Sequence, residues 1–272
     1  MKPIAESAIL FVVDGMRPDG VLQANTPTMH ALMQRGASTL RAQTVMPSVT
    51  LPTHMSMFHG VPVEVHTVTD NTWHPMPGWP IPGIIDLVRM ENRKPVAFYT
   101  WEQLRDIWRP GSVAYSSFIN MYGPDGAGSD MGIACLAADY LEHEQPDFTF
   151  IYLGMVDDAG HQHGWLSAEY QQSIAAADAA IAHVLERLEC VGRLEHTALL
   201  LTADHGGHER SHGMDIPEDM TIPWMLAGPG IKKSYSIAGP VRIYDTAPTL
   251  AHLLGLSIPA EWQGQPVLEA LE

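Results

Sequence analysis

Acidic residues and histidines in this 272-residue chain gather just after stretches of apolar residues. The run AILFVV is followed by an aspartate, FTFIYLGMV by an aspartate and then a histidine, and ALLLTA by an adjacent aspartate and histidine. Together with a later histidine and one threonine, the candidate set is Asp14, Thr50, Asp157, His161, Asp204, His205 and His212. Carboxylates and imidazoles around one hydroxyl suit a two-metal centre with a built-in nucleophile, which is chemistry that cleaves phosphate esters.

The apolar runs predict the elements that must position these side chains. Short continuous apolar runs alternate with helical patterns, which predicts an α/β fold with a mostly parallel central sheet sandwiched by helices. The expected strands are 7–13, 96–100, 147–153, 197–203 and 222–227. Ligands of such sheets bind beyond the carboxyl ends of the strands. Three aspartates at that edge would repel one another, and bound dications would offset the repulsion.

Each candidate ligand also has a simpler structural explanation. An aspartate after a strand is usually a turn or helix cap, and a lone histidine such as His212 is usually a surface residue. Two glycines follow Asp204 and His205, and their backbone freedom lets adjacent side chains turn toward one ion. Oxygen beside imidazole nitrogen suits zinc, manganese or iron better than calcium.

The spacing within the second motif leaves two aspartates open. Asp157 and His161 are four residues apart across a glycine turn, so they can reach a common point. Asp158 is a competing ligand, and spacing alone does not choose between the two. His163 and His208 lie close to the motifs and are expected to support the ligands from behind.

Thr50 is the candidate nucleophile. It precedes an apolar helix expected at 53–58, so its hydroxyl would lie at the positive end of a helix dipole, where a phosphate is also favoured. A threonine hydroxyl needs a metal to become reactive at neutral pH, and the alternative is that Thr50 only caps the helix. Asn71 can donate its amide to a phosphate oxygen or serve as a turn former.

Helices are expected at 26–35, at 167–190 with Ser167 as N-cap, and at 246–254. The proline-rich stretch 71–83 and the stretch 108–128 are expected to be irregular loop insertions that form a small cap and the walls of a pocket. Aromatic residues that could stack on a base or cover a leaving group are Trp73, Trp79, Trp101 and Tyr122.

Composition limits the class of protein. Length and a hydrophobic content of 46% fit one globular domain over 1–272. A net charge of −16, from 15 basic and 31 acidic residues, argues against long nucleic acid as a partner. Cys135 and Cys190 fall in expected helices and give no disulfide framework. The N-terminal apolar run is too short for a membrane span and lacks signal-peptide features, so we expect a cytoplasmic protein without a membrane partner. The oligomeric state is left open, with a homodimer as one option.

In order and spacing, the motifs resemble those of the alkaline phosphatase superfamily, and most of all its type I phosphodiesterase / nucleotide pyrophosphatase branch. They are FVVDGMRPD, TLPTH, VDDAGH, ADHGGH and SHG, with IPWMLAGPGI at 222–231 and YDTAPTLAHLLG at 244–255. The resemblance covers nearly the whole chain and implies an alkaline-phosphatase-like fold.

The resemblance also implies roles for individual residues. One zinc ion would be held by Asp14, Thr50, Asp204 and His205, and the other by Asp157, His161 and His212. The family register selects Asp157 over Asp158. Thr50 matches a nucleophile that becomes transiently phosphorylated, and Asn71 matches the asparagine of the phosphate pocket, although Thr67 stands where the family usually has glycine.

Departures from other branches narrow the expected activity. Sulfatases carry an oxidisable cysteine or serine at the nucleophile, so Thr50 closes the formylglycine route. We expect a two-metal hydrolase that cleaves a small-molecule phosphodiester or pyrophosphate through a phosphothreonine. The alternatives are a phosphomonoesterase or phosphonate hydrolase of the same superfamily, and an inactive metal-binding protein, against which the intact Thr50 and ligand set argue.

Overall fold

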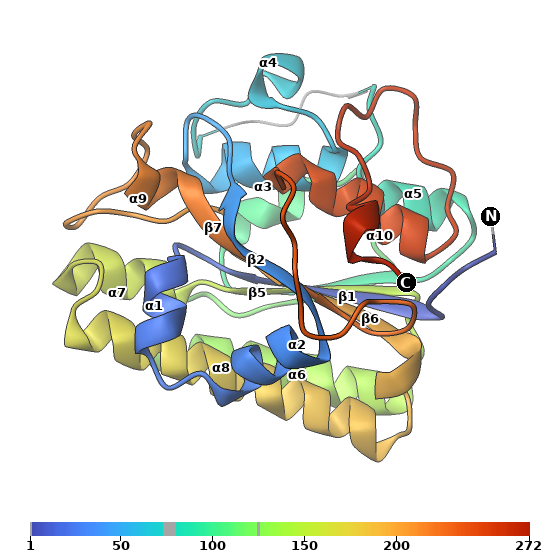
Figure 1. Cartoon of the computed structure of the whole chain (residues 1–272), viewed down its shortest axis with the longest axis horizontal. Helices are drawn as coiled ribbons and strands as arrows, with labels where there is room; N and C mark the ends of the chain where they lie inside the picture. Colours follow the sequence, from blue (N-terminus) through green and yellow to red (C-terminus); the bar gives the residue numbers. More distant parts are fainter. Residues whose placement is uncertain (1, 73–79, 124–125) are drawn as a thin grey trace.

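The computed structural model describes residues 2–72, 80–123 and 126–272. They contain one eight-stranded sheet in the order β4-β3-β5-β1-β6-β7-β2-β8 (Figure 1). The strands are β1 Ser7–Val13, β2 Gly36–Gln43, β3 Pro95–Tyr99, β4 Tyr115–Phe118, β5 Phe148–Leu153, β6 Thr197–Thr202, β7 Thr221–Ala227 and β8 Tyr235–Ser236. Only β7 runs against its neighbours β6 and β2. The predicted, mostly parallel sheet is confirmed. Each of the five expected strands is present, and both of its ends lie within one residue of the predicted positions.

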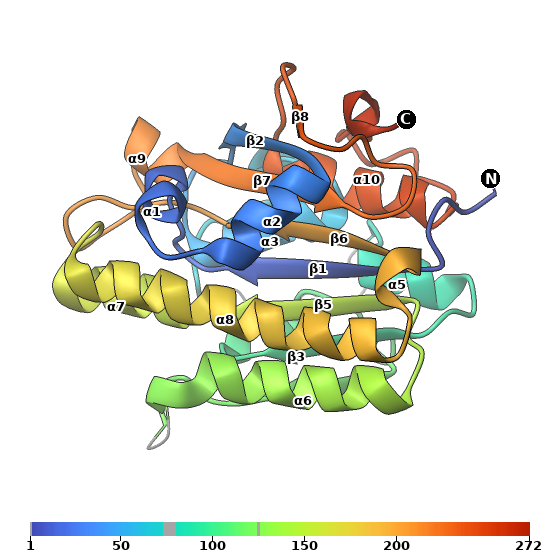
Figure 2. The same ribbon diagram turned by 60° about the horizontal axis from the view of Figure 1, so that its bottom comes forward.

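Helices cover both faces of the sheet (Figures 1 and 2). One face carries α1 Pro18–Gln23, α2 Pro27–Arg35, α6 Ser129–His143, α7 Met155–His163 and α8 Ala168–Cys190. The other carries α3 Thr50–His59, α4 Val63–His66, α5 Ile84–Met90 and α10 Thr246–Leu253, while α9 Pro217–Met220 precedes β7. Short 3₁₀ turns are η1 Glu102–Asp106, η2 Gly126–Gly128, η3 Leu194–His196, η4 Ile243–Asp245 and η5 Leu268–Ala270.

The central strands explain their own sequence pattern. All residues of β1, β5 and β6 are buried, because helices cover both faces, and the strands are therefore continuous apolar runs. The Ser167 hydroxyl accepts a hydrogen bond from the Tyr170 backbone N–H at 3.2 Å, which confirms the predicted N-cap of α8. The thiols of Cys135 in α6 and Cys190 in α8 are free.

Two local expectations are wrong, and one strand was not predicted. Strand β4 lies within the stretch 108–128 that was expected to be irregular; it has no apolar pattern because it is a mostly exposed sheet edge, formed by parallel pairing with β3. Strand β2, of sequence GASTLRAQ, was not predicted because small and polar residues obscure its pattern. Asp157 and His161 lie on a helix, α7, rather than across a glycine turn.

Part of the proline-rich stretch lies outside the residues that the structure describes. Trp73 and Trp79 lie outside the described residues, so the contribution of the stretch 71–83 to a cap stays a prediction. Within the described part of the chain, no helix has both the length and the apolar character that crossing a membrane requires.

Candidate metal centre

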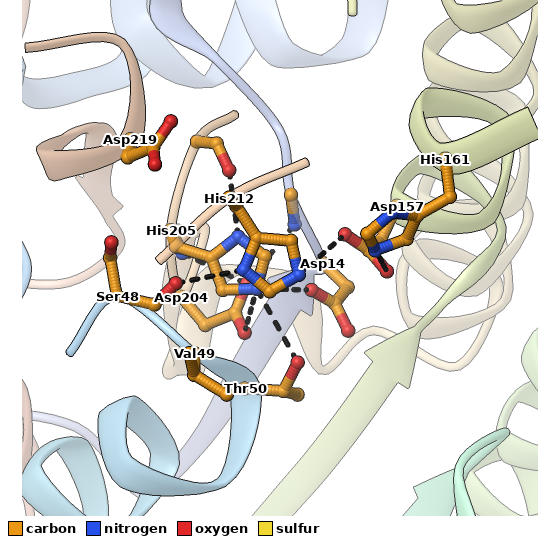
Figure 3. Close-up of polar contacts among 12 residues, drawn as sticks. Asp14, Ser48, Val49, Thr50, Asp157, His161, Asp204, His205, His212 and Asp219 are labelled. Atoms are coloured by element: carbon orange, nitrogen blue, oxygen red, sulfur yellow. Dashed lines mark hydrogen bonds and ion pairs between the residues drawn. The ribbon is translucent and has the colours of Figure 1, made fainter. Parts of the chain in front are cut away.

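The sheet order brings the predicted residues to one edge. Strand β1 lies between β5 and β6, so the segments after these three strands are neighbours. Asp14 follows β1, the Asp204–His205 pair follows β6, and α7 follows β5. Thr50 is the first residue of α3, and His212 comes from the loop before α9. Figure 3 shows the side chains of all seven predicted residues gathered there.

The first ligand set surrounds one imidazole nitrogen. His205 Nε2 lies 3.2 Å from Asp14 Oδ1, 3.4 Å from Asp204 Oδ2 and 3.4 Å from Thr50 Oγ1. Tetrahedral zinc with bonds of about 2.0–2.1 Å places its ligand atoms roughly 3.3 Å apart. All four side chains are buried. Each of these three oxygens therefore lies near ligand-to-ligand distance from the His205 nitrogen, and Asp14, His205 and Asp157 of the neighbouring set have ligand atoms within 4.8 Å of one another.

The second ligand set lies beside the first. Asp157 Oδ2 is 3.3 Å from His161 Nε2, and Asp157 Oδ1 is 3.7 Å from His212 Nε2. The i, i+4 spacing on α7 puts Asp157 and His161 on one helix face. Asp158 is engaged elsewhere, since its Oδ2 accepts from Gln162 at 2.6 Å. The His212 and His205 rings are stacked with their centroids 3.8 Å apart, so the two ligand sets lie next to each other.

Backbone carbonyls set the orientation of the three histidines. Nδ1 of His161 faces Arg210 O at 3.0 Å, Nδ1 of His205 faces Gly206 O at 2.8 Å, and Nδ1 of His212 faces Ser48 O at 2.8 Å. A carbonyl can only accept, so Nδ1 carries the proton in each neutral ring. In His205 and His212 the Nε2 lone pair therefore faces the carboxylates, as in metal-ligating histidines, and Nε2 of His161 faces Asp157.

Some carboxylate oxygens of the centre accept hydrogen bonds from other groups of the protein, and others have no donor. The Tyr152 hydroxyl donates to Asp14 Oδ2, and the backbone N–H groups of Gly15 and His205 donate to Asp204 Oδ1 at 3.1 and 2.9 Å. Asp14 Oδ1 and Asp157 Oδ1 are buried and accept no hydrogen bond among the described residues. A buried anionic oxygen without a donor is strongly unfavourable, and a bound cation would satisfy both atoms.

Burial and mutual repulsion shift the ionisation of this cluster. Burial, reinforced by Asp204 and Asp157, raises the pKa of Asp14 well above its usual value, and burial also raises the pKa of Asp204. Burial lowers the pKa of His205 and lowers that of His212 to about 4. The hydrogen bond with Asp157 instead raises the pKa of His161 to about 9. Three carboxylates buried together therefore resist being ionised at the same time, and a bound cation would relieve their mutual repulsion.

Thr50 and Asn71 meet at the start of α3. The residue in the N-cap position is Val49, so the alternative that Thr50 merely caps the helix is wrong. The Leu51 N–H donates to Asn71 Oδ1 at 2.9 Å. Because a backbone N–H needs an acceptor, the Asn71 carbonyl faces Leu51, and its NH₂ group is left for another acceptor. This arrangement suits a group that donates to a phosphate oxygen.

Of the two histidines expected to support the ligands, His208 contacts the loop that carries His205, whereas His163 is exposed. His208 Nδ1 is bonded to the buried Asp219 at 2.8 Å, and the Asp219 carbonyl accepts from Gly206 N–H, so this pair shapes the loop that carries His205. His163 is exposed at the end of α7. Trp101 packs in the core and presents little surface for stacking. Tyr122 is 67% exposed, and partial burial of its phenol with the nearby charges of Asp14 and Asp157 raises its pKa to about 12.

His54, in the TLPTH motif, is fully buried and donates from Nδ1 to the Thr50 carbonyl at 2.7 Å. Two other contributors to the centre carry no sequence signal of their own. Tyr152, whose hydroxyl donates to Asp14, lies in β5, where the sequence indicates only core packing. Trp165 packs against the rings of His161 and His212. Only the pairing of distant segments identifies them.

Comparison with known proteins identifies a family model and several relatives that match this chain. A family model described as type I phosphodiesterase / nucleotide pyrophosphatase matches residues 8–113 and 79–221. GPI ethanolamine phosphate transferase 1 of Neurospora crassa is 23% identical over 329 aligned positions, which cover 98% of this chain and 32% of that protein. Ectonucleotide pyrophosphatase/phosphodiesterase family member 3 of Rattus norvegicus is 26% identical over 226 positions, covering 75% and 25%.

Solved structures support the same fold. Human ectonucleotide pyrophosphatase / phosphodiesterase 5 superposes with a TM-score of 0.83 at 15% identity, covering 98% of this chain and all of that one. The alkaline-phosphatase-like architecture predicted from the motifs is thereby confirmed. The chain spans a third or less of the length of the curated relatives it matches.

Proposed function

The chain belongs to the type I phosphodiesterase / nucleotide pyrophosphatase family, and on that basis we propose that it hydrolyses a phosphodiester or pyrophosphate bond with Thr50 as nucleophile. The observation that carries the proposal is the position of Thr50 Oγ1, 3.4 Å from His205 Nε2 among buried ligand side chains. A buried hydroxyl in a ring of carboxylates and imidazoles has no evident structural task there.

We assign two ion sites to the centre. Asp14, Thr50, Asp204 and His205 would hold one divalent ion, and Asp157, His161 and His212 the other. Mixed oxygen and imidazole donors favour zinc, with manganese or iron as alternatives. Bound there, the ions would lower the pKa of the Thr50 hydroxyl and of a water molecule and neutralise charge on the phosphoryl group.

The protein's own groups bind and orient the phosphate. The Thr50 backbone N–H, at the start of α3, has no partner within the helix and would donate to an anion placed beyond the helix end. The Asn71 amide is held beside it by its bond to Leu51 N–H. Both groups would donate to the non-bridging oxygens as their charge grows.

The proposed reaction has two balanced steps. Thr50 Oγ loses its proton to solvent and attacks phosphorus, the bond to the leaving oxygen breaks, that oxygen takes up a proton from solvent, and phosphothreonine forms. A water molecule then loses a proton to solvent and attacks the same phosphorus, the bond to Thr50 Oγ breaks, and Thr50 Oγ takes up a proton from solvent as the phosphoryl product leaves. The exposed side of the second set, where the His161 side chain is 43% accessible, gives substrate and water a route in.

A substrate panel with Thr50 variants tests this function. Metal-replete wild type is assayed with a bis-aryl phosphodiester, an aryl monophosphate, phosphonoacetate and an aryl sulfate, and metal content is measured in parallel. We expect the diester to be preferred. Thr50→Ala should keep its metal and lose turnover by about 10³-fold or more, whereas Thr50→Ser, which retains a hydroxyl, should keep part of it.

The outcomes separate the alternatives. Preference for the monophosphate or for phosphonoacetate would assign the chain to the corresponding activity. Equal, negligible rates in wild type and Thr50→Ala on every ester would support a metal-binding protein without catalysis. Loss of metal from Thr50→Ala would make Thr50 a structural ligand.

A further inference from the structure

Trp165, in the segment between α7 and α8, contacts both histidines of the second ligand set. The indole ring centroid lies 5.2 Å from that of His161 at an interplanar angle of 85°, and 6.0 Å from that of His212 at 63°. These histidines come from segments about fifty residues apart. One indole that is 8% exposed therefore packs against the rings of both.

The indole nitrogen ties the same residue to the first ligand set. Trp165 Nε1–H donates to the Gly15 carbonyl at 2.9 Å, and the Tyr170 hydroxyl donates to the same oxygen at 2.8 Å. The Gly15 N–H in turn donates to Asp204 Oδ1 at 3.1 Å. The backbone after Asp14 is thus hydrogen-bonded to the Trp165 indole, which packs against the two histidines of the second set.

Two glycines let the backbone close on the indole. A Cβ atom added at Gly160 in α7 would lie 2.7 Å from Trp165 Cε2, and one added at Gly207, in the loop after β6, would lie 2.1 Å from the same atom. Both distances are below those that real Cβ atoms adopt. Trp165 is therefore held between α7 and the loop that carries His205 and His212, with little room to move.

From these contacts we propose that Trp165 is the positioning residue of the second ion set. It fixes the ring planes of His161 and His212 and locks them to the Gly15 segment. The inference rests on the proposed function, because it assumes an ion bound by Asp157, His161 and His212. Residues that orient ligands from behind commonly change metal affinity by about 10–100-fold.

The test compares Trp165 with a matched tryptophan elsewhere. Trp262 is 4% exposed, its indole N–H donates to the Pro82 carbonyl at 2.9 Å, and it packs against Gly60, so it has the same kind of anchoring away from the ligands. Zinc dissociation constants are measured by chelator competition for wild type, Trp165→Leu, Trp165→Phe and Trp262→Leu. His161→Ala and Asp14→Asn assign each ion to its set.

We expect Trp165→Leu to weaken the second ion by about tenfold or more and the first by less than about threefold. Trp165→Phe, which keeps a ring against the imidazoles but loses the N–H, should lie between Leu and wild type. Trp262→Leu should lower the unfolding temperature without changing either constant. Wild-type tryptophan emission should change when the second ion binds, and that change should vanish in Trp165→Phe.

Each outcome is decisive. Wild-type affinity for both ions in Trp165→Leu and Trp165→Phe would reduce Trp165 to ordinary core packing and overturn the inference. If Trp165→Leu fails to fold, the Phe variant and its emission decide the question. If wild type itself binds no ion that depends on His161, the proposed metal centre fails, and the inference fails with it.

Discussion

At the scale of single residues, histidines that lie within one cluster differ in charge because their neighbours differ. Burial lowers the pKa of His205 and of His54 and lowers that of His212 to about 4, so burial disfavours the charged form of all three rings. His161 is partly open to solvent and bonded to the Asp157 carboxylate, which raises its pKa to about 9. In the metal-free protein, His161 is therefore the ligand for which a proton competes with an ion.

This competition predicts a pH dependence of metal binding. His161 keeps its proton below pH 9, so an ion must displace it, and affinity for the second ion should rise by up to about tenfold per pH unit between 7 and 9. Above pH 9 the rise should level off. Chelator competition at pH 7, 8 and 9 measures the slope, which His161→Ala should abolish. A flat wild-type profile would mean that the His161–Asp157 pair is not charged.

At the scale of elements, helix α7 both carries two candidate ligands and packs closely against Trp165. It presents Asp157 and His161 on one face, and it brings Gly160 against the Trp165 ring. Glycine is a poor helix former, so its place within α7 is explained by close approach rather than by helix preference. Packing and helix propensity make opposite demands at this residue.

A pair of glycine substitutions distinguishes these demands. Gly132 in α6 faces only the flexible end of Ile119, 3.0 Å from an added Cβ, whereas Gly160 faces the rigid indole of Trp165 at 2.7 Å. We expect Gly132→Ala to be stabilising by up to about 1 kcal/mol from helix propensity. Gly160→Ala should destabilise the protein by about 1–3 kcal/mol through overpacking. Urea unfolding measures both, and equal stabilisation would show that the indole yields freely.

At the scale of the whole molecule, the sheet order concentrates negative charge. Placing β1 between β5 and β6 puts Asp14, Asp157 and Asp204 together in a chain whose net charge is −16. Two of their oxygens accept no hydrogen bond within the described residues. Burying such charges opposes folding unless a cation joins them. Folding and metal binding should therefore be coupled.

Metal removal tests that coupling. With an ion at about 1,000 times its dissociation constant, binding stabilises the folded state by roughly 4 kcal/mol, so a chelator should lower the unfolding temperature of wild type by several degrees. Asp14→Asn should lose much of this response. In chelator it should be more stable than wild type, because one buried carboxylate is gone. The same chelator-induced loss in both proteins would place the stabilising ion elsewhere.

The sequence by itself determined the candidate residues and the central strands. Uninterrupted apolar runs such as 7–13 and 197–203 can only be buried, and polar residues directly after them must lie at a sheet edge. The residues selected in this way, Asp14, Asp157, His161, Asp204 and His205, converge in the structure with Thr50 and His212, which follow no apolar run. The role of all seven as ligands and nucleophile stays a prediction that the metal and Thr50 experiments address.

Only the tertiary structure decided what depends on neighbours far apart in the chain. The edge strand β4 exists because β3 offers it hydrogen bonds, and β2 because β7 does. The orientation of each imidazole ring and the support from Tyr152 and Trp165 depend on the order β5-β1-β6. That order is not the order of the chain, and the contacts it creates leave no periodic trace in the sequence of any one segment.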